Sequence, residues 1–244
     1  MEKQILDYTL VPAGLLLMVT YHFWLLFRIL NHPNKTVIGF NSLNRRFWVS
    51  AMMEDVSKTG VLAVQTLRNN IMASTVLASA AIMLSSVIAV LMTGKNGDRS
   101  FGVVFGDKSP MGISIKYFAI LVCFLFSFLL NVQSIRYYSL ASILINVPFK
   151  KMYLSPHSHH LTAEYVGTTV NKGSYFWSLG LRAFYFSFPL FLWIFGPIPM
   201  FLSCLVMVLM LYLSTSPSNP AGLLGPLNWR RIIPTTAKFN GLMA

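Results

Sequence analysis

The chain has 244 residues, of which 55% are hydrophobic and only 11% are charged, whereas about a quarter of the residues in a soluble domain are charged. This composition excludes an ordinary soluble protein and predicts an integral membrane protein. The formal net charge of +12 does not indicate nucleic-acid binding here, because lysine and arginine concentrate at membrane edges. We therefore expect membrane lipids, especially those with acidic headgroups, as partners, and no nucleic acid.

Four long stretches contain no charged side chain, and each reaches or approaches the about 20 residues that a helix needs to cross a bilayer. They run from Tyr8 up to Arg28 and over Asn69–Gly94, Tyr117–Ile135 and Ala183–Trp229. Spanning segments should be helices, because no water is present in the hydrocarbon core to satisfy the backbone. We predict an all-α helical bundle with four main transmembrane helices.

The first predicted span covers about Leu6–Leu30. Loop one becomes helical from Asn44 onward, where apolar residues recur at helical spacing among charged ones, which predicts an amphipathic helix on the membrane or leading into the next span. The second span, about Asn69–Met92, is rich in Ala and Ser, which let helices approach closely in lipid. We expect it at the centre of the bundle, with its Ala/Ser face as one contact of a homo-oligomer.

The third span begins near Ile113, and its apolar character continues to about Val147, which is long enough to project beyond the bilayer or to bury Arg136. Loop three, about Phe149–Leu179, is polar. The fourth span covers about Tyr175–Leu213.

The fourth span is interrupted by Pro189 and by the group Gly196-Pro197-Ile198-Pro199. A single kinked helix is the first interpretation, and a broken helix or short re-entrant hairpin is the alternative. The helical transmembrane domain should therefore cover residues 1–213, followed by a loosely ordered tail over 214–244.

The distribution of basic residues suggests an orientation. Loops one and three with their flanking arginines hold eleven Lys and Arg, and the termini plus loop two hold eight. The positive-inside rule then places loops one and three in the cytoplasm and both termini outside the cell or in a lumen. The glycosylation sequon Asn34-Lys35-Thr36 points the other way.

An arginine stands at one edge of each charge-free stretch: Arg28, Arg68, Arg136 and Arg182. In a chain that crosses the membrane four times, all four arginines lie on one side and at one depth. Nearby amides, Asn69, Asn131 and Gln133, are costly in lipid unless they face protein or water. Because guanidinium binds carboxylate and phosphate in a bidentate manner, this belt could bind an anion. Alternatively, the arginines anchor the helices at the interface, some of them paired with Glu54 or Asp55.

Other candidate sites are weaker. Three histidines, His157, His159 and His160, could bind zinc with Glu164, but a solvated loop with incidental histidines is the simpler interpretation. No Gly-x-Ser-x-Gly elbow, phosphate loop or His-Glu-x-x-His motif is present in the sequence. We therefore expect no enzyme activity, no metal site and no cofactor.

Four segments together resemble a plant and bacterial integral membrane family catalogued as domain of unknown function 599, and the plant branch is the most similar. They are RRFWVSAMMED (Arg45–Asp55), QTLRNNIMAS (Gln65–Ser74), NVQSIRYYSLASILI (Asn131–Ile145) and GLRAFYFSFPLFLWIFGP (Gly180–Pro197). The resemblance runs from the first span to Leu213. It implies a multi-span helical membrane protein and no particular activity.

The leading functional prediction is an oligomeric channel-like or transport protein with an arginine belt that attracts anions. Four spans enclose little room, so transport would require a homo-oligomer. The alternative is a membrane scaffold or adaptor that binds acidic lipids or partner proteins through its basic loops. A lipid-modifying enzyme that uses the histidine cluster ranks last.

Overall fold

The computed structural model describes residues 2–31, 36–93, 110–147 and 163–215, which form an all-α structure. Its helices are α1 (Glu2–Asn31), α2 (Val37–Glu54), α3 (Val56–Thr93), α4 (Pro110–Leu144), α6 (Ala163–Leu192) and α7 (Pro197–Thr215). The predicted all-α membrane bundle is confirmed. Four helical stretches in the described part are long and apolar enough to cross a membrane: Asp7–Asn31, Val56–Thr93, Met111–Leu144 and Pro197–Thr215.

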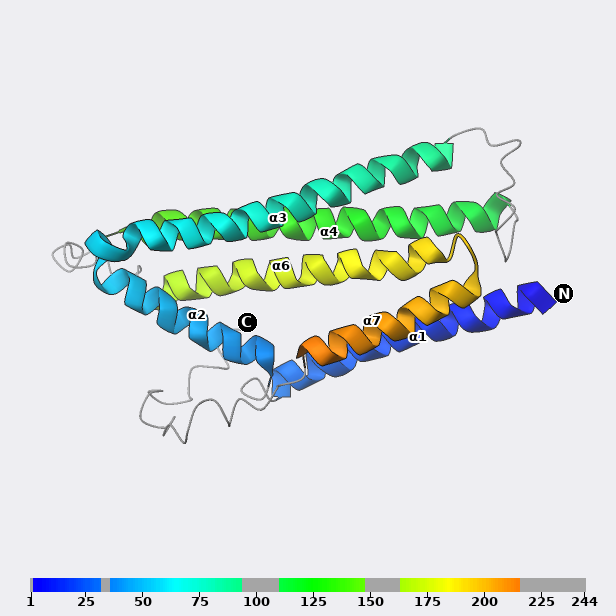
Figure 1. Ribbon diagram of the computed structural model, residues 1–244, viewed down its shortest axis with the longest axis horizontal. Coiled ribbons are helices and arrows are strands. Elements are labelled where there is room, and N and C mark those ends of the chain that lie inside the picture. The colour runs from blue at the N-terminus through cyan, green and yellow to red at the C-terminus, as the bar shows by residue number, and fades with distance from the viewer. Residues whose placement is uncertain (1, 32–35, 94–109, 148–162, 216–244) are drawn as a thin grey trace.

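The helices pack in the order α3, α4, α6, α7, α1, with α2 across one end against α6 and α3 (Figure 1). The predicted central position of the second span is therefore wrong, because α3 lies at the outside of the bundle and packs mainly on α4. Its buried small residues face α4 of the same chain and are not free to contact a second copy: Ser74, Ala78, Ala81 and Ser85.

The fourth predicted span is two helices, so the single kinked helix is wrong and the alternative, a broken helix, is correct. α6 ends at Leu192, and Gly196 has a φ of 152°, a backbone conformation that glycine adopts more readily than other residues. α7 then begins at Pro197, where the missing N–H of proline costs no helical hydrogen bond. α7 runs back antiparallel to α6 (Figure 1).

This reversal changes the predicted topology. Five helices now run along the bundle, so the start of α1 and the end of α7 lie at opposite ends of the α1–α7 pair (Figure 1). The expectation that both termini share one side is therefore wrong for these helix ends. Much of predicted loop three is also helical, because α6 already begins at Ala163.

The predicted amphipathic helix in loop one is confirmed as α2, which begins earlier than Asn44. Thr36 caps it by accepting a hydrogen bond from the backbone N–H of Gly39 at 3.3 Å. One face of α2 is buried through Val49 and Met53.

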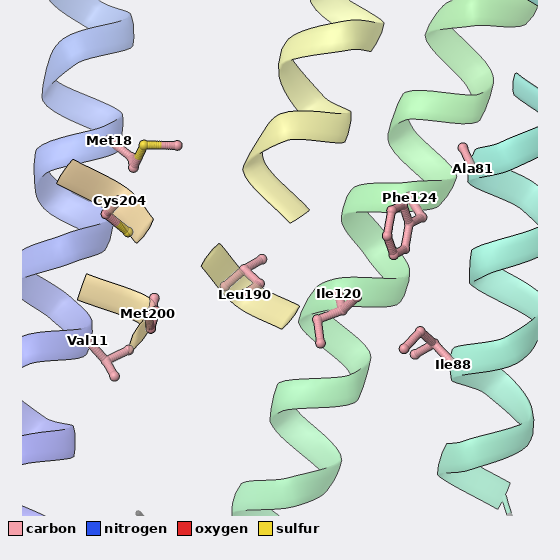
Figure 2. Packing of buried hydrophobic residues seen from close by; sticks show 9 residues of the cluster. All are labelled: Val11, Met18, Ala81, Ile88, Ile120, Phe124, Leu190, Met200 and Cys204. Carbon is pink, nitrogen blue, oxygen red and sulfur yellow. The ribbon is translucent and has the colours of Figure 1, made fainter. Parts of the chain in front are cut away.

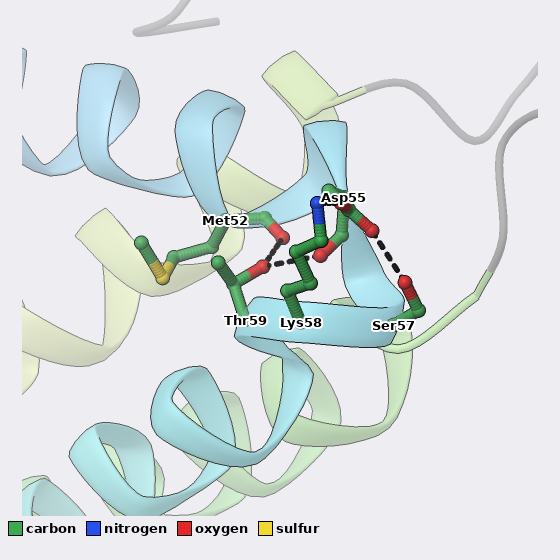
Figure 3. Close-up of polar contacts among 5 residues, drawn as sticks. All are labelled: Met52, Asp55, Ser57, Lys58 and Thr59. Carbon is green, nitrogen blue, oxygen red and sulfur yellow. Dashed lines mark hydrogen bonds and ion pairs between the residues drawn. The ribbon is translucent and has the colours of Figure 1, made fainter.

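A sharp junction joins α2 to α3 at Asp55 (Figure 3). The Thr59 hydroxyl donates to the carbonyl oxygens of Met52 and Asp55, both at 2.7 Å. Lys58 Nζ lies 3.2 Å from a carboxylate oxygen of Asp55. The hydroxyl of Ser57, and then Lys58, lower the pKa of Asp55. The expected pairing of Asp55 with an arginine is therefore wrong, because its cationic partner is Lys58.

Two hydrophobic clusters fill the bundle, one after the other along its length. The first joins α1, α3, α4, α6 and α7 (Figure 2) through Val11, Met18, Ala81, Ile88, Ile120, Phe124, Leu190, Met200 and Cys204. The second lies nearer α2 and comprises Val49, Met53, Ala63, Leu67, Tyr138, Ala141, Ile145, Val166 and Val170. Between the two clusters, α4 carries the fully buried polar residues Ser127, Asn131 and Ser134. We call these three residues and Ser74 the polar layer.

Candidate functional site

Hydrogen bonds of the polar layer fix how α3, α4 and α6 align. Ser134 Oγ donates to the carbonyl of Gly173 at 2.8 Å and lies 3.1 Å from Ser74 Oγ. Ser127 Oγ donates to the carbonyl of Gly180 at 2.8 Å. The antiparallel pairs Ser134–Gly173 and Ser127–Gly180 set the level of every other residue on these helices.

The structure brings three of the four predicted arginines toward the end of the bundle where α2 lies, which we call the basic end. Arg68 precedes Ser74 on α3 and Arg136 follows Ser134 on α4, so both lie on the α2 side of the Ser74–Ser134 contact. Both are exposed. Arg28 is in the last turn of α1, with its guanidinium carbon 5.2 Å from the centre of the Trp24 ring.

Arg182 does not share this level, so the predicted common depth is wrong for this residue. It follows Gly180, which lies opposite Ser127, whereas Arg136 lies beyond Ser134. The offset along α4 is about three turns, or roughly 16 Å. Arg182 is half-buried and close enough to Tyr21 and His22 of α1 to interact with them electrostatically.

The predicted amides divide into two kinds. Asn131 is fully buried, and its Nδ2 donates to the carbonyl of Ser127 at 2.8 Å. It packs on Gly180, where an added Cβ would lie 2.4 Å from Asn131 Nδ2. Asn131 therefore serves the α4–α6 contact and lines no open path within one chain. Asn69 and Gln133 are exposed on α3 and α4.

Sequence reasoning missed a polar cluster between α2, α4 and α6. Arg45 Nε donates to Asn171 Oδ1 at 2.7 Å, and Asn171 Nδ2 donates to the carbonyl of Ser42 at 3.1 Å. The Tyr175 hydroxyl donates to Ser42 Oγ at 3.0 Å. The signal was available, because Arg45 precedes buried Val49 by one helical turn and so lies on the buried face of α2.

Arg45 and Arg46 form no ion pair with an acidic residue in the part of the chain that the structure describes. The ion pair found there joins Lys58 to Asp55. Burial lowers the pKa of Arg45, and the hydroxyls of Tyr138 and Tyr175 act in the opposite direction. Arg46 Nε is buried without a hydrogen-bond partner. Arg46 packs on Gly167, where an added Cβ would lie 3.3 Å from Arg46 Cγ.

The remaining candidates contribute little to a site. The histidines His157, His159 and His160 lie outside the described residues, and Glu164 is exposed in the first turn of α6. Within the described ranges, no group of three His, Cys, Asp or Glu could hold a metal ion. His22 Nδ1 lies 2.7 Å from the carbonyl oxygen of Met18, one turn earlier on α1.

A sequence profile described as "Protein of unknown function, DUF599" matches residues 9–219, which covers most of the chain. The chain belongs to this family. The resemblance identified from four segments is thereby confirmed, and the DUF599 match begins within α1 and includes all of α7. No curated protein and no solved structure matches the chain. The family description names no reaction or ligand.

Proposed function

We propose that this DUF599 protein binds anionic phospholipid headgroups at the cytoplasmic face of its membrane and acts there as a membrane scaffold or adaptor. The observation that carries this proposal is the pair Arg68 and Arg136. Both side chains are exposed near the same level of adjacent helices, and neither forms an ion pair with a described residue. Guanidinium groups placed in this way suit bidentate binding of phosphate.

The length of the helices supports headgroup level for these arginines. α3 has 38 residues and is about 57 Å long, whereas the hydrocarbon core is about 30 Å thick. If Arg68 and Arg136 lie among headgroups, the first hydrophobic cluster occupies the hydrocarbon core. The second cluster, with α2, then forms a helical head outside the bilayer. Arg45 and Arg46 belong to this head and add positive charge close to the membrane surface.

Charge distribution supports the cytoplasmic orientation of the head. At the basic end, the described helices carry Arg28, Arg45, Arg46, Lys58, Arg68, Arg136 and Lys172, whereas the helices at the other end carry Lys3 and Lys116. The positive-inside rule favours the basic end in the cytoplasm.

Thermal unfolding in detergent micelles tests lipid binding. We expect added phosphatidylglycerol to raise the Tm of the wild type more than added phosphatidylcholine, because only the former lipid has a net negative charge. The double variant Arg68→Gln/Arg136→Gln should lose most of this difference. Lys172→Gln, which removes an exposed cation at the same end, should keep most of it. An unchanged phosphatidylglycerol effect in the double variant would contradict the proposal.

One observation favours anion transport by an assembly as a second candidate. Arg182 is half-buried well inside the bundle, and it makes no hydrogen bond or ion pair with the described residues. Ionisable residues inside membrane spans are costly and commonly mark ion or substrate pathways.

A flux measurement tests this candidate. Proteoliposomes containing the purified protein should then show anion efflux, measured as chloride or glutamate release, that Arg182→Gln abolishes because the intramembrane cation is lost. Arg136→Gln is the matched control at the surface. Absence of any flux above that of protein-free liposomes would remove transport of these two anions.

A further inference from the structure

A shallow, open groove lies on the surface between α1 and α7. It has a volume of about 310 Å³ and is lined by Leu17, Thr20, Tyr21, Trp24 and Tyr212. The two helices approach closely beside it because Gly14 faces Cys204, where an added Cβ would lie 3.2 Å from the sulfur. The groove is therefore a fixed product of the α1–α7 contact.

Its walls are aromatic and held in place. The ring centres of Trp24 and Tyr212 lie 6.1 Å apart, and those of Tyr21 and Trp24 are also 6.1 Å apart. Tyr21 is buried, with its hydroxyl 3.0 Å from Thr215 Oγ1, whereas Trp24 and Tyr212 are 42% and 45% exposed. The floor is thus closed, and the two rims face the surroundings of the bundle.

The groove changes character along its length. Arg28 lies one turn beyond Trp24 toward the basic end, with its guanidinium over the Trp24 ring and no acidic partner among the described side chains. Leu17 lies at the opposite end. From Leu17 to Arg28 the axis of α1 rises by about 16 Å, which is close to half of the about 30 Å hydrocarbon thickness and so to the depth of one leaflet.

We propose that this groove binds one anionic phospholipid, with its phosphate at Arg28 and an acyl chain along Trp24 and Tyr21 toward Leu17. A cation at the mouth of an apolar groove matches the polarity of such a lipid in this order. A zwitterionic headgroup fits less well, because it brings its own cation next to Arg28. The site lies on α1 and α7 and does not depend on the Arg68–Arg136 pair.

Trp24 fluorescence in nanodiscs tests the site. The contribution of Trp24 is the difference between the wild type and Trp24→Phe. In one sample, a small fraction of phosphatidylglycerol with brominated acyl chains is added to unlabelled phosphatidylcholine. In the other, the brominated lipid is phosphatidylcholine. We expect the brominated phosphatidylglycerol to quench the Trp24 contribution as strongly as an about fivefold larger fraction of brominated phosphatidylcholine, because one basic residue supplies a preference of about that size. Added NaCl should reduce the preference through screening.

Variants distinguish lipid binding in this groove from lipid binding elsewhere at the basic end. Arg28→Gln should equalise quenching by the two lipids, whereas Arg68→Gln/Arg136→Gln should leave the preference at Trp24 intact. Equal quenching by both brominated lipids in the wild type would overturn the proposal without any variant. A preference that is lost in Arg68→Gln/Arg136→Gln and kept in Arg28→Gln would also overturn it, because the selectivity would then come from the other pair.

Discussion

Replacing Gly180 with alanine should lower the free energy of unfolding by about 1–3 kcal/mol, the usual cost of overpacking a tight contact. The new Cβ would lie 2.4 Å from Asn131 Nδ2 and 3.0 Å from Asn131 Cγ. Asn131 cannot move away easily, because it is fully buried and its Nδ2 is bonded to the carbonyl of Ser127. Thermal unfolding followed by size-exclusion chromatography measures the loss.

Two further variants identify the clash as the cause. Leu179→Ala changes the neighbouring residue, which is 53% exposed, and should have a much smaller effect. Adding Asn131→Ala to Gly180→Ala should restore stability, because it opens the space that the new Cβ needs. It also removes Asn131 Oδ1, which is buried without a partner. If the double variant were no more stable than Gly180→Ala, steric conflict with Asn131 would not explain the loss.

Replacing Asn171 with leucine should detach α2 from α6. Asn171 accepts a hydrogen bond from Arg45 Nε and donates one to the Ser42 carbonyl, so leucine removes both and leaves a half-buried guanidinium without its acceptor. A hydrogen bond to a charged group is worth about 1.5–3 kcal/mol, which corresponds to roughly tenfold or more in the population of the opened state. Limited trypsin digestion should therefore cleave after Arg45 and Arg46 at least about tenfold faster.

The neighbouring residue provides the control for this experiment. Lys172→Leu makes a similar change at an exposed position of the same helix and should leave the rate of cleavage in α2 unchanged. Equal cleavage rates in Asn171→Leu and the wild type would mean that other contacts hold α2, such as Val49 and Met53 in the second hydrophobic cluster.

Several features could be predicted from the sequence because they depend on local composition. Charge-free stretches indicated the first three spans, and the apolar run past Arg136 indicated that α4 is long. The arginines at positions 28, 68 and 136, at the edges of those stretches, correctly marked one end of the bundle. They did so because each of these three helices has charged residues on both sides of its apolar stretch.

Other features could not be predicted, because they depend on which helices meet. The Gly196-Pro197-Ile198-Pro199 group marked an interruption of the fourth span but left a kink, a break and a hairpin open, and the backbone at Gly196 shows that the chain turns there. That turn also moved Arg182 away from the other arginines. The role of Asn131 depends on its contact with Gly180, and that of Arg45 on Asn171, and both partners are far away in the sequence.

The turn at Gly196 also determines at which end of the bundle α7 ends. Because five helices run along the bundle, Thr215 emerges at the end that carries α2, while α1 starts at the other end. If all five helices cross the membrane, enzymes of the compartment that contains α2 can act on the end of α7, whereas the start of α1 faces the other compartment.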